Sequence, residues 1–238
     1  LRMFNLFNWI GEQLGFSATT MHSYIHVITG LFIALVITTL SLLAYRKLKN
    51  TEDCVIPPKK LSIAGVFELA VEAVLNLMRE IMGARAEMYF PIIGATFIYI
   101  LISNLFGVIP GFIPPTDNIN TNAAIAVVIF LYYNVVGIKA QGLKHYLGHM
   151  AGPIIWLGPL IFCIELISHL VRPLSLSARL FGNMTGDHMV LEIFSNLTPL
   201  VIPIIFLGLG IFISFIQAFV FSLLSIIYIA LATEHEAH

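Results

Sequence analysis

Residues 172–184 read RPLSLSARLFGNM and lie inside an apolar stretch that runs from Ile154 to Phe194. Arg179, in the second half of this run, keeps its proton at any working pH. A guanidinium at the centre of a bilayer costs about 2.5–3.5 kcal/mol on insertion scales. A chain tolerates such a charge only where it meets a partner, water or a function. This segment is therefore the first candidate for a functional site.

The composition of the whole chain indicates an integral membrane protein. Its 238 residues are 58% apolar and 11% charged, whereas a soluble domain is about 25% charged. We expect residues 1–238 to form a single integral membrane domain, built from helices because these satisfy their own backbone in lipid. The net charge of −1 gives no case for nucleic-acid binding, and Cys54 and Cys163 suggest neither a disulfide framework nor a metal site. The first twenty residues lack a continuous apolar core, so we expect no cleavable signal peptide.

Apolar runs of about 20 residues are the length of a membrane-spanning helix. The chain has such runs at 24–45, 89–109, 123–138, 154–194 and 200–232. This pattern predicts an all-α polytopic membrane protein with about five transmembrane helices. The fourth run is too long to stand upright, so it must tilt, bend or lie partly along the membrane. We expect the last two long helices to form a tilted hairpin.

Residues 61–84 show a different pattern, with polar residues on one helical stripe and apolar residues over most of the rest. The polar stripe consists of Glu68, Glu72, Asn76, Arg79 and Glu80. The pattern predicts one amphipathic helix, on the membrane surface or against neighbouring helices. The alternative is a packed sixth span with a polar stripe.

The positions of lysine and arginine predict the orientation. Basic residues gather in the 46–60 and 139–150 segments, and none occurs from 86 to 138. Because cytoplasmic loops are enriched in Lys and Arg, we expect these two segments and the C-terminus inside. The 110–122 loop and the N-terminus are then outside.

The long helix around Arg179 carries polar residues on one face. At about 100° per residue, six of them fall close to one line: Glu165, His169, Arg172, Arg179, Asn183 and Asp187. Ser175 flanks this line. An ion path, or a charge that faces a partner, would explain so polar a stripe in a membrane helix. The alternative is that Glu165 and Arg172 pair with each other and with a neighbouring subunit to hold an assembly together.

Other polar residues of the apolar stretches are weaker candidates. His188 and Glu192 point roughly opposite the first line, toward the outer end of the helix; a packed histidine and an interfacial carboxylate are the alternatives. In the last helix, Gln217 is the main polar member of a face that could also serve helix packing. Asn104 lies inside the second span, and Asn120 lies in the outside loop. His145 and His149 have no third ligand nearby in the sequence, so we expect no metal there.

The sequence resembles one known family over nearly the whole chain, and three motifs carry the resemblance. SLSARLFGNM at 175–184, QAFVF at 217–221 and NLFGVIP at 104–110 are similar to subunit a of the F-type ATP synthase. The resemblance implies a subunit beside a rotating ring of c subunits, each with a buried carboxylate. Ions, H⁺ or Na⁺, would enter by one half-channel, ride the ring and leave by the other. The chain itself would hold no catalytic site and no cofactor. Its partners would be the c-ring, the peripheral-stalk b subunits, other ATP synthase subunits and the lipid bilayer.

The resemblance also implies roles for single residues. Arg179 matches the essential arginine of the family, and Gln217 matches the polar residue that faces it. A fixed positive charge favours the ionised form of a nearby carboxylate, so Arg179 would make a ring carboxylate release its proton. It would also block a direct leak, which the membrane potential drives by about 2.3 kcal/mol per charge per 100 mV. Asn183 matches the asparagine that follows this arginine.

The two half-channels would use different residues. The resemblance assigns Glu165 and Ser175 to the inner path, and the stripe adds His169. Helix geometry suggests an outer path through Asn104, Asn120, His188 and Glu192. His188 falls where many relatives carry Glu, and the position that faces it from the last helix matches Gly210.

The implied location is the bacterial cytoplasmic (inner) membrane, with an organellar energy-transducing membrane as the alternative. Two other functions stay open on the residues alone. One is a stand-alone channel or secondary transporter, which the absence of repeated halves weakens. The other is a structural membrane anchor whose polar stripes serve only subunit contacts.

Overall fold

The computed structural model describes residues 18–48, 63–109, 112–143, 146, 148, 157–197 and 201–233. These residues form the helices α2 (Ala18–Leu48), α3 (Ile63–Met82), α4 (Ala86–Val108), α5 (Ile119–Gln141), α7 (Gly158–Leu197) and α8 (Val201–Thr233), with the short turns η1 (Gly83–Arg85) and η2 (Pro115–Asp117). No strand occurs in these ranges. Three sets of residues that carry sequence predictions lie outside the described residues: 1–17, where we expect no signal peptide, the His145 and His149 pair, and the C-terminal residues 234–238.

Five helical stretches among the described residues are long and apolar enough to cross a membrane. They are Tyr24–Tyr45, Val71–Val108, Ile119–Gln141, Gly158–Ser195 and Pro203–Thr233. The prediction of an all-α polytopic membrane protein with about five spans is confirmed. Each predicted run lies within a few residues of an observed helix, because the length of an apolar run is a property of the sequence itself.

Helix α3 is amphipathic, as its pattern predicts. All five residues of its polar stripe are exposed, whereas Val74 and Met78 are buried in the core that α3 shares with α4 and α8. The turn η1 then reverses the chain into α4 and places Gly83 at φ 62°, a left-handed conformation that glycine adopts without steric cost. The second spanning stretch, Val71–Val108, thus includes the end of α3 as well as all of α4.

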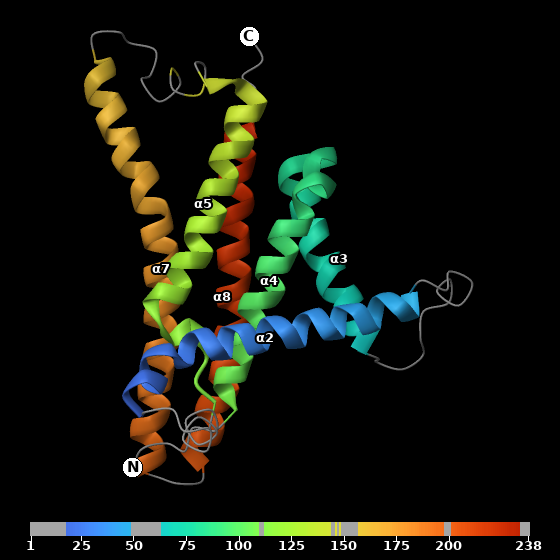
Figure 1. Cartoon of the computed structure of the whole chain (residues 1–238), viewed down its shortest axis with the longest axis vertical. Helices are drawn as coiled ribbons and strands as arrows, with labels where there is room; N and C mark the ends of the chain where they lie inside the picture. Colours follow the sequence, from blue (N-terminus) through green and yellow to red (C-terminus); the bar gives the residue numbers. More distant parts are fainter. Residues whose placement is uncertain are drawn as a thin grey trace.

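The last two helices form an antiparallel hairpin (Figure 1). Helix α7 has 40 residues and is therefore about 60 Å long, whereas the hydrocarbon core of a bilayer is about 30 Å thick. Helix α2 runs across α4, α5 and α8 rather than alongside them (Figure 1). Because α2 and the hairpin point in such different directions, they cannot all stand upright in one membrane. The sequence predicts that the hairpin is tilted, and α7 is the longest of the described helices.

The ends of α5 are fixed by local hydrogen bonds. The Asn118 side chain caps its start, where Oδ1 accepts a 2.9 Å hydrogen bond from the backbone N–H of Asn120. Gly142 ends it with φ 81°, which suits glycine at a helix C-terminus. Asn118 thus has the cap role that asparagine favours before a helix.

Candidate functional site

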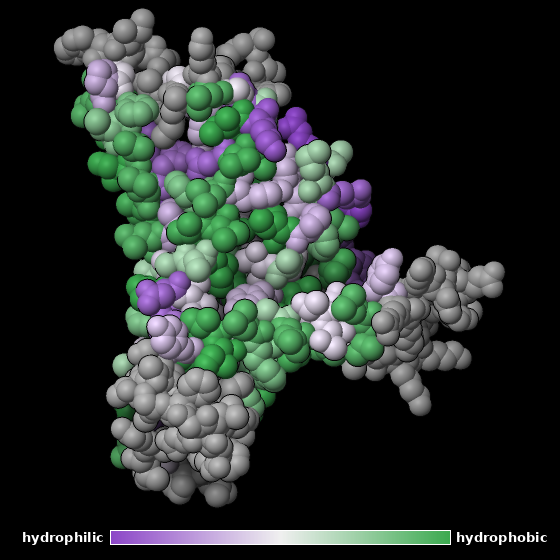
Figure 2. All heavy atoms as spheres, in the orientation of Figure 1, coloured by the Kyte–Doolittle hydropathy of each residue, from purple (hydrophilic) through white to green (hydrophobic). Residues whose placement is uncertain are grey.

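A polar cluster joins α7 to α5 and α8 toward the C-terminal end of α5. Glu165 Oε1 lies 3.7 Å from His169 Nε2 and 3.5 Å from Arg172 Nη2. The Arg172 guanidinium carbon lies 5.1 Å from the ring centroid of Tyr228 on α8, a distance at which a cation and an aromatic face attract. Hydrophilic surface gathers between the upper parts of α7 and α5 in Figure 2, at this level of the hairpin. The pairing of Glu165 with Arg172, which the assembly alternative expects, is present.

Helix α5 and the segment after it contribute residues to this cluster that were not predicted from the sequence. Tyr133 Oη lies 3.2 Å from His169 Nδ1. The hydroxyl of Tyr146 donates a 2.9 Å hydrogen bond to Asn134 Oδ1, and the Tyr146 ring lies 6.3 Å from the His169 ring. The available signal was the polar triplet YYN at 132–134 inside an otherwise apolar span. Burial raises the pKa of Tyr146, which keeps its hydroxyl protonated and able to donate.

The middle of the hairpin holds one direct polar link between its two helices. Asn183 Nδ2 on α7 donates a 2.6 Å hydrogen bond to Gln217 Oε1 on α8. Gln217 is 3% exposed, so this bond satisfies an amide oxygen that would otherwise be costly to bury. Both residues are predicted from the sequence as site residues, but their bond to each other is not predicted.

Arg179 lies outside both the cluster around Glu165 and the Asn183–Gln217 bond. Its side chain is exposed. Among the described residues it makes neither an ion pair nor a hydrogen bond. Arg172, seven residues earlier on the same helix, has both a carboxylate and an aromatic ring against its guanidinium. The hairpin therefore contains one paired and one uncovered cation.

The polar residues near the start of α5 form a second group, here called the outer group, which η2 holds together with contributions from α4, α5 and α7. Thr116 donates a 2.8 Å hydrogen bond from Oγ1 to Asn104 Oδ1, and its carbonyl accepts one from Asn122. Thr185 of α7 donates a 2.6 Å hydrogen bond to Asp117 Oδ1. Asn104 is fully buried, and its Nδ2 has no hydrogen-bond partner among the described residues.

Besides Arg179, three exposed residues among those predicted for the site lie outside the Glu165 cluster and the group around Asn104. Ser175, Asn120 and Glu192 are exposed. Asn120 contacts the outer group only through its backbone N–H, which bonds the cap residue Asn118. Of the residues predicted for an inner path, Glu165 and His169 thus lie together, whereas Ser175 is exposed outside their cluster.

The structure corrects the expected pairing of His188 with Gly210. A Cβ atom at Gly210 would lie 2.7 Å from Asp187 Oδ2, so the neighbouring carboxylate occupies that space. His188 points to α4 instead, where its Nε2 lies 2.8 Å from the position of a Cβ at Gly107. Adjacent helical residues point about 100° apart, so the rotation of α7 decides which of the two faces α8.

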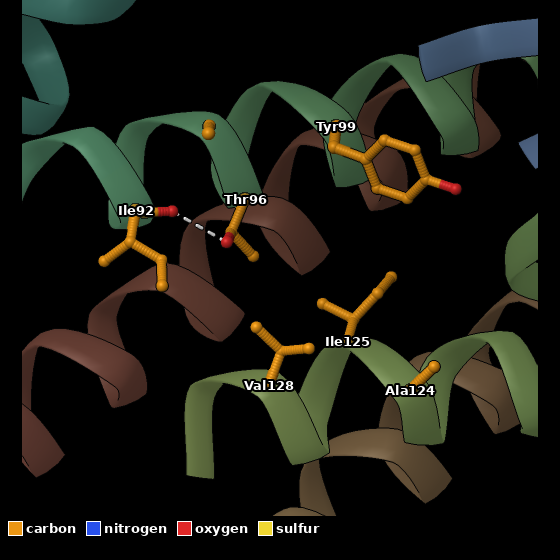
Figure 3. A pocket seen from close by; sticks show the side chains of 7 residues that line it. Ile92, Thr96, Tyr99, Ala124, Ile125 and Val128 are labelled. Carbon is orange, nitrogen blue, oxygen red and sulfur yellow. Dashed lines mark hydrogen bonds between the residues drawn. The ribbon is translucent and has the colours of Figure 1, made fainter. Parts of the chain in front are cut away.

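A groove of about 340 Å³ between α4 and α5 is apolar and lies away from these residues. Figure 3 shows Ile92, Thr96 and Tyr99 on its α4 side, opposite Ile125 and Val128 of α5. The Thr96 hydroxyl donates to the Ile92 carbonyl of its own helix at 2.8 Å. The groove therefore offers lipid or another apolar helix a surface with little free hydrogen-bonding capacity.

Comparisons with known proteins identify close relatives. Residues 26–230 match the family described as ATP synthase A chain. ATP synthase subunit a of Geobacter sulfurreducens is 52% identical over 172 residues, which cover 72% of this chain and 74% of the relative. ATP synthase subunit a of Bdellovibrio bacteriovorus is 41% identical over 230 residues, 97% of this chain and 99% of the relative. ATP synthase subunit a 2 of Syntrophotalea carbinolica is 44% identical over 239 residues, 99% of this chain and 98% of the relative.

Proposed function

Because the chain belongs to the ATP synthase A chain family, we propose that it is the subunit that passes ions to and from a rotating c-ring. It is a multi-pass membrane protein, and its residues 1–238 act as one membrane domain. The ions, H⁺ or Na⁺, reach the ring carboxylates by one half-channel and leave by the other. Its bacterial relatives support a location in the bacterial cytoplasmic membrane.

The observation that carries this proposal is the uncovered charge of Arg179. A side chain that served only to hold the chain together would be paired, as Arg172 is with Glu165. An exposed guanidinium within the tilted hairpin instead needs a negative partner from outside the chain. A carboxylate that arrives on a ring supplies that charge for part of each cycle, and the arginine lowers its affinity for the ion.

The hairpin that carries Arg179 also exposes large apolar side chains. Leu174 of α7 is 62% exposed, and Phe212 and Phe215 of α8 are 59% and 53% exposed. A partner helix with apolar faces and one carboxylate is complementary to a hairpin that exposes such side chains and one unpaired charge. The c-ring fits this description, and Asn183 with Gln217 fixes the two helices that present the surface.

The two polar groups are proposed to border the half-channels. Glu165 and His169, with Ser175 closer to Arg179, line the inner path. Asn104, His188 and Glu192 line the outer path, with Asn120 at its mouth. The unpartnered Asn104 Nδ2 favours a hydrated outer path, because a buried amide needs a hydrogen-bond partner that water can supply.

The partners follow from the same assignment. Besides the c-ring, the peripheral-stalk b subunits hold this chain against rotation, and the other ATP synthase subunits complete the complex. The chain has no nucleotide chemistry of its own to perform in this scheme. Its contribution to ATP synthesis is ion translocation.

The test is ATP synthesis and ATP-driven pumping by the whole complex in vesicles, with Arg179→Gln and with wild type, at several sodium concentrations. The variant should assemble normally and lose both activities. Near-normal ATP synthesis by the variant would overturn the proposal. Transport by the purified chain alone would favour a stand-alone channel, and a dependence of pumping on sodium would identify Na⁺ as the ion.

A further inference from the structure

The contact between Tyr133 and His169 bears on which ring nitrogen of the histidine carries the hydrogen, and so on what His169 presents to Glu165. The two ring nitrogens of His169 face different groups: Nδ1 lies 3.2 Å from Tyr133 Oη, and Nε2 lies 3.7 Å from Glu165 Oε1. A carboxylate accepts hydrogen bonds and cannot donate them. Of the two neutral tautomers, the one with its hydrogen on Nε2 directs an N–H toward this carboxylate, whereas the other directs a lone pair at it, so the Nε2–H form is favoured electrostatically.

The same reasoning fixes the direction of the bond to Tyr133. A neutral imidazole has one N–H and one lone pair, so a hydrogen on Nε2 leaves Nδ1 as the acceptor. Tyr133 must then donate to it.

We propose that Tyr133 is a positioning residue of the inner half-channel, which holds His169 as the Nε2–H tautomer and so aims a donor at Glu165. This inference rests on the proposed ion path and names a residue outside the motifs of α7. Glu165 Oε1 then faces two groups that can only donate, Arg172 Nη2 at 3.5 Å and His169 Nε2 at 3.7 Å. The inner path thus depends on a hydroxyl from α5.

The surroundings of His169 are closed by aromatic rings. Its neighbours are Glu165 and Arg172 on its own helix, Tyr133 on α5, Tyr146 after α5, and Tyr228 on α8 through the Tyr133 ring. Tyr146 donates its hydrogen to Asn134 and so is not the donor to His169. Within the described residues, the hydroxyl of Tyr133 is the side-chain group placed to hold Nδ1.

The experiment measures ATP-driven ion pumping across a range of pH by the whole complex in vesicles. Tyr133→Phe removes one oxygen and keeps the ring contacts with Phe130, His169 and Tyr228. We expect pumping to fall about fivefold, the equivalent of one hydrogen bond of about 1 kcal/mol, with a shifted pH profile. Tyr132→Phe is the matched control, because Tyr132 makes no side-chain hydrogen bond with the described residues.

A second set of variants, made in a chain that carries His169→Gln, separates an effect on the orientation of His169 from a loss of side-chain packing. His169→Gln replaces the imidazole with an amide that has no tautomer to select, and the pumping rate of this variant is the reference for its own background. Adding Tyr133→Phe to it should change neither the rate nor the pH profile. An equal loss from Tyr133→Phe in both backgrounds, or no loss in the wild-type background, would overturn the inference. Loss of pumping in Arg179→Gln would still stand in that case, so the two proposals fail separately.

Discussion

Asn183 on α7 donates a 2.6 Å hydrogen bond to Gln217 on α8 and so joins the two helices of the hairpin one turn beyond Arg179. The bond crosses between segments 34 residues apart. It keeps the surface that carries Arg179 at a fixed rotation relative to α8. A charge that must meet a passing carboxylate benefits from such a fixed frame, because small misplacements cost large factors in rate.

The first prediction concerns this bond. Asn183→Leu leaves Gln217 Oε1 buried without its donor, which should destabilise the hairpin by about 1–3 kcal/mol. The midpoint of heat-induced dissociation of the purified complex should fall, and ATP synthesis with it. Asn183→Leu combined with Gln217→Leu should cost less stability than the sum of the single changes. Asn76→Leu, at an exposed position of α3, is the control, and equal effects at 76 and 183 would contradict the prediction.

The second prediction uses the two glycines at the start of α8. A Cβ at Gly210 would lie 2.7 Å from Asp187 Oδ2, whereas a Cβ at Gly208 would meet nothing within 4 Å. Gly210→Ala should therefore displace the Asp187 carboxylate, the far end of a side chain that can rotate. Stability should change little, and ATP-driven pumping should fall by roughly tenfold because the outer path is distorted.

The matched control for that change is Gly208→Ala, which should pump like wild type. Asp187→Ala should make the complex insensitive to Gly210→Ala, since the group that the methyl displaces is gone. Equal pumping by the two alanine variants would show that the Asp187 contact has no part in ion transfer.

The third prediction concerns the C-terminal end of α8. Arg85 Nη1 donates a 2.8 Å hydrogen bond to the carbonyl of Thr233, one of the last carbonyls of the helix, where a cation is also favoured by the helix dipole. Arg85→Ala should lower the stability of the complex by about 1 kcal/mol. Arg79→Ala removes a salt bridge to Glu87 whose two side chains are mostly exposed, and should cost at most about 0.5 kcal/mol. Thermal dissociation compares the two, and a larger loss for Arg79→Ala would refute the assignment.

The fourth prediction concerns orientation. Ile119 and Lys139 lie near opposite ends of α5 and are both exposed. After replacement of Cys54 and Cys163 by serine, single cysteines at 119 and 139 in oriented vesicles should react with impermeant thiol reagents from opposite sides. Position 139 should react from the cytoplasmic side, because the basic residues gather there. Reaction from one side at both positions would overturn the topology.

Much of the fold could be predicted from the sequence because it depends on local properties. The length of each apolar run sets the spans, and the spacing of Glu68, Glu72 and Asn76 predicts the amphipathic α3. The length of α7 alone predicts a helix that tilts, bends or lies partly along the membrane, since 40 residues are about twice what an upright span needs. The polar line on α7 also follows from helical periodicity, which is why Glu165, His169 and Arg172 could be grouped before their contacts were known.

Only the tertiary structure decided what these faces meet. Periodicity gives the direction of a side chain around its own helix, but it does not give the rotation, shift or crossing angle of the neighbouring helix. The resemblance to the family placed Gly210 opposite His188, whereas the rotation of α7 brings Asp187 there. The sequence did not reveal Tyr133 either, because the contact of this residue with His169 spans 36 residues and exists only where α5 packs on α7. The uncovered state of Arg179 has the same origin: the arginine itself is fixed by the sequence, and its lack of a partner within the described residues is fixed by the packing of all the helices around it.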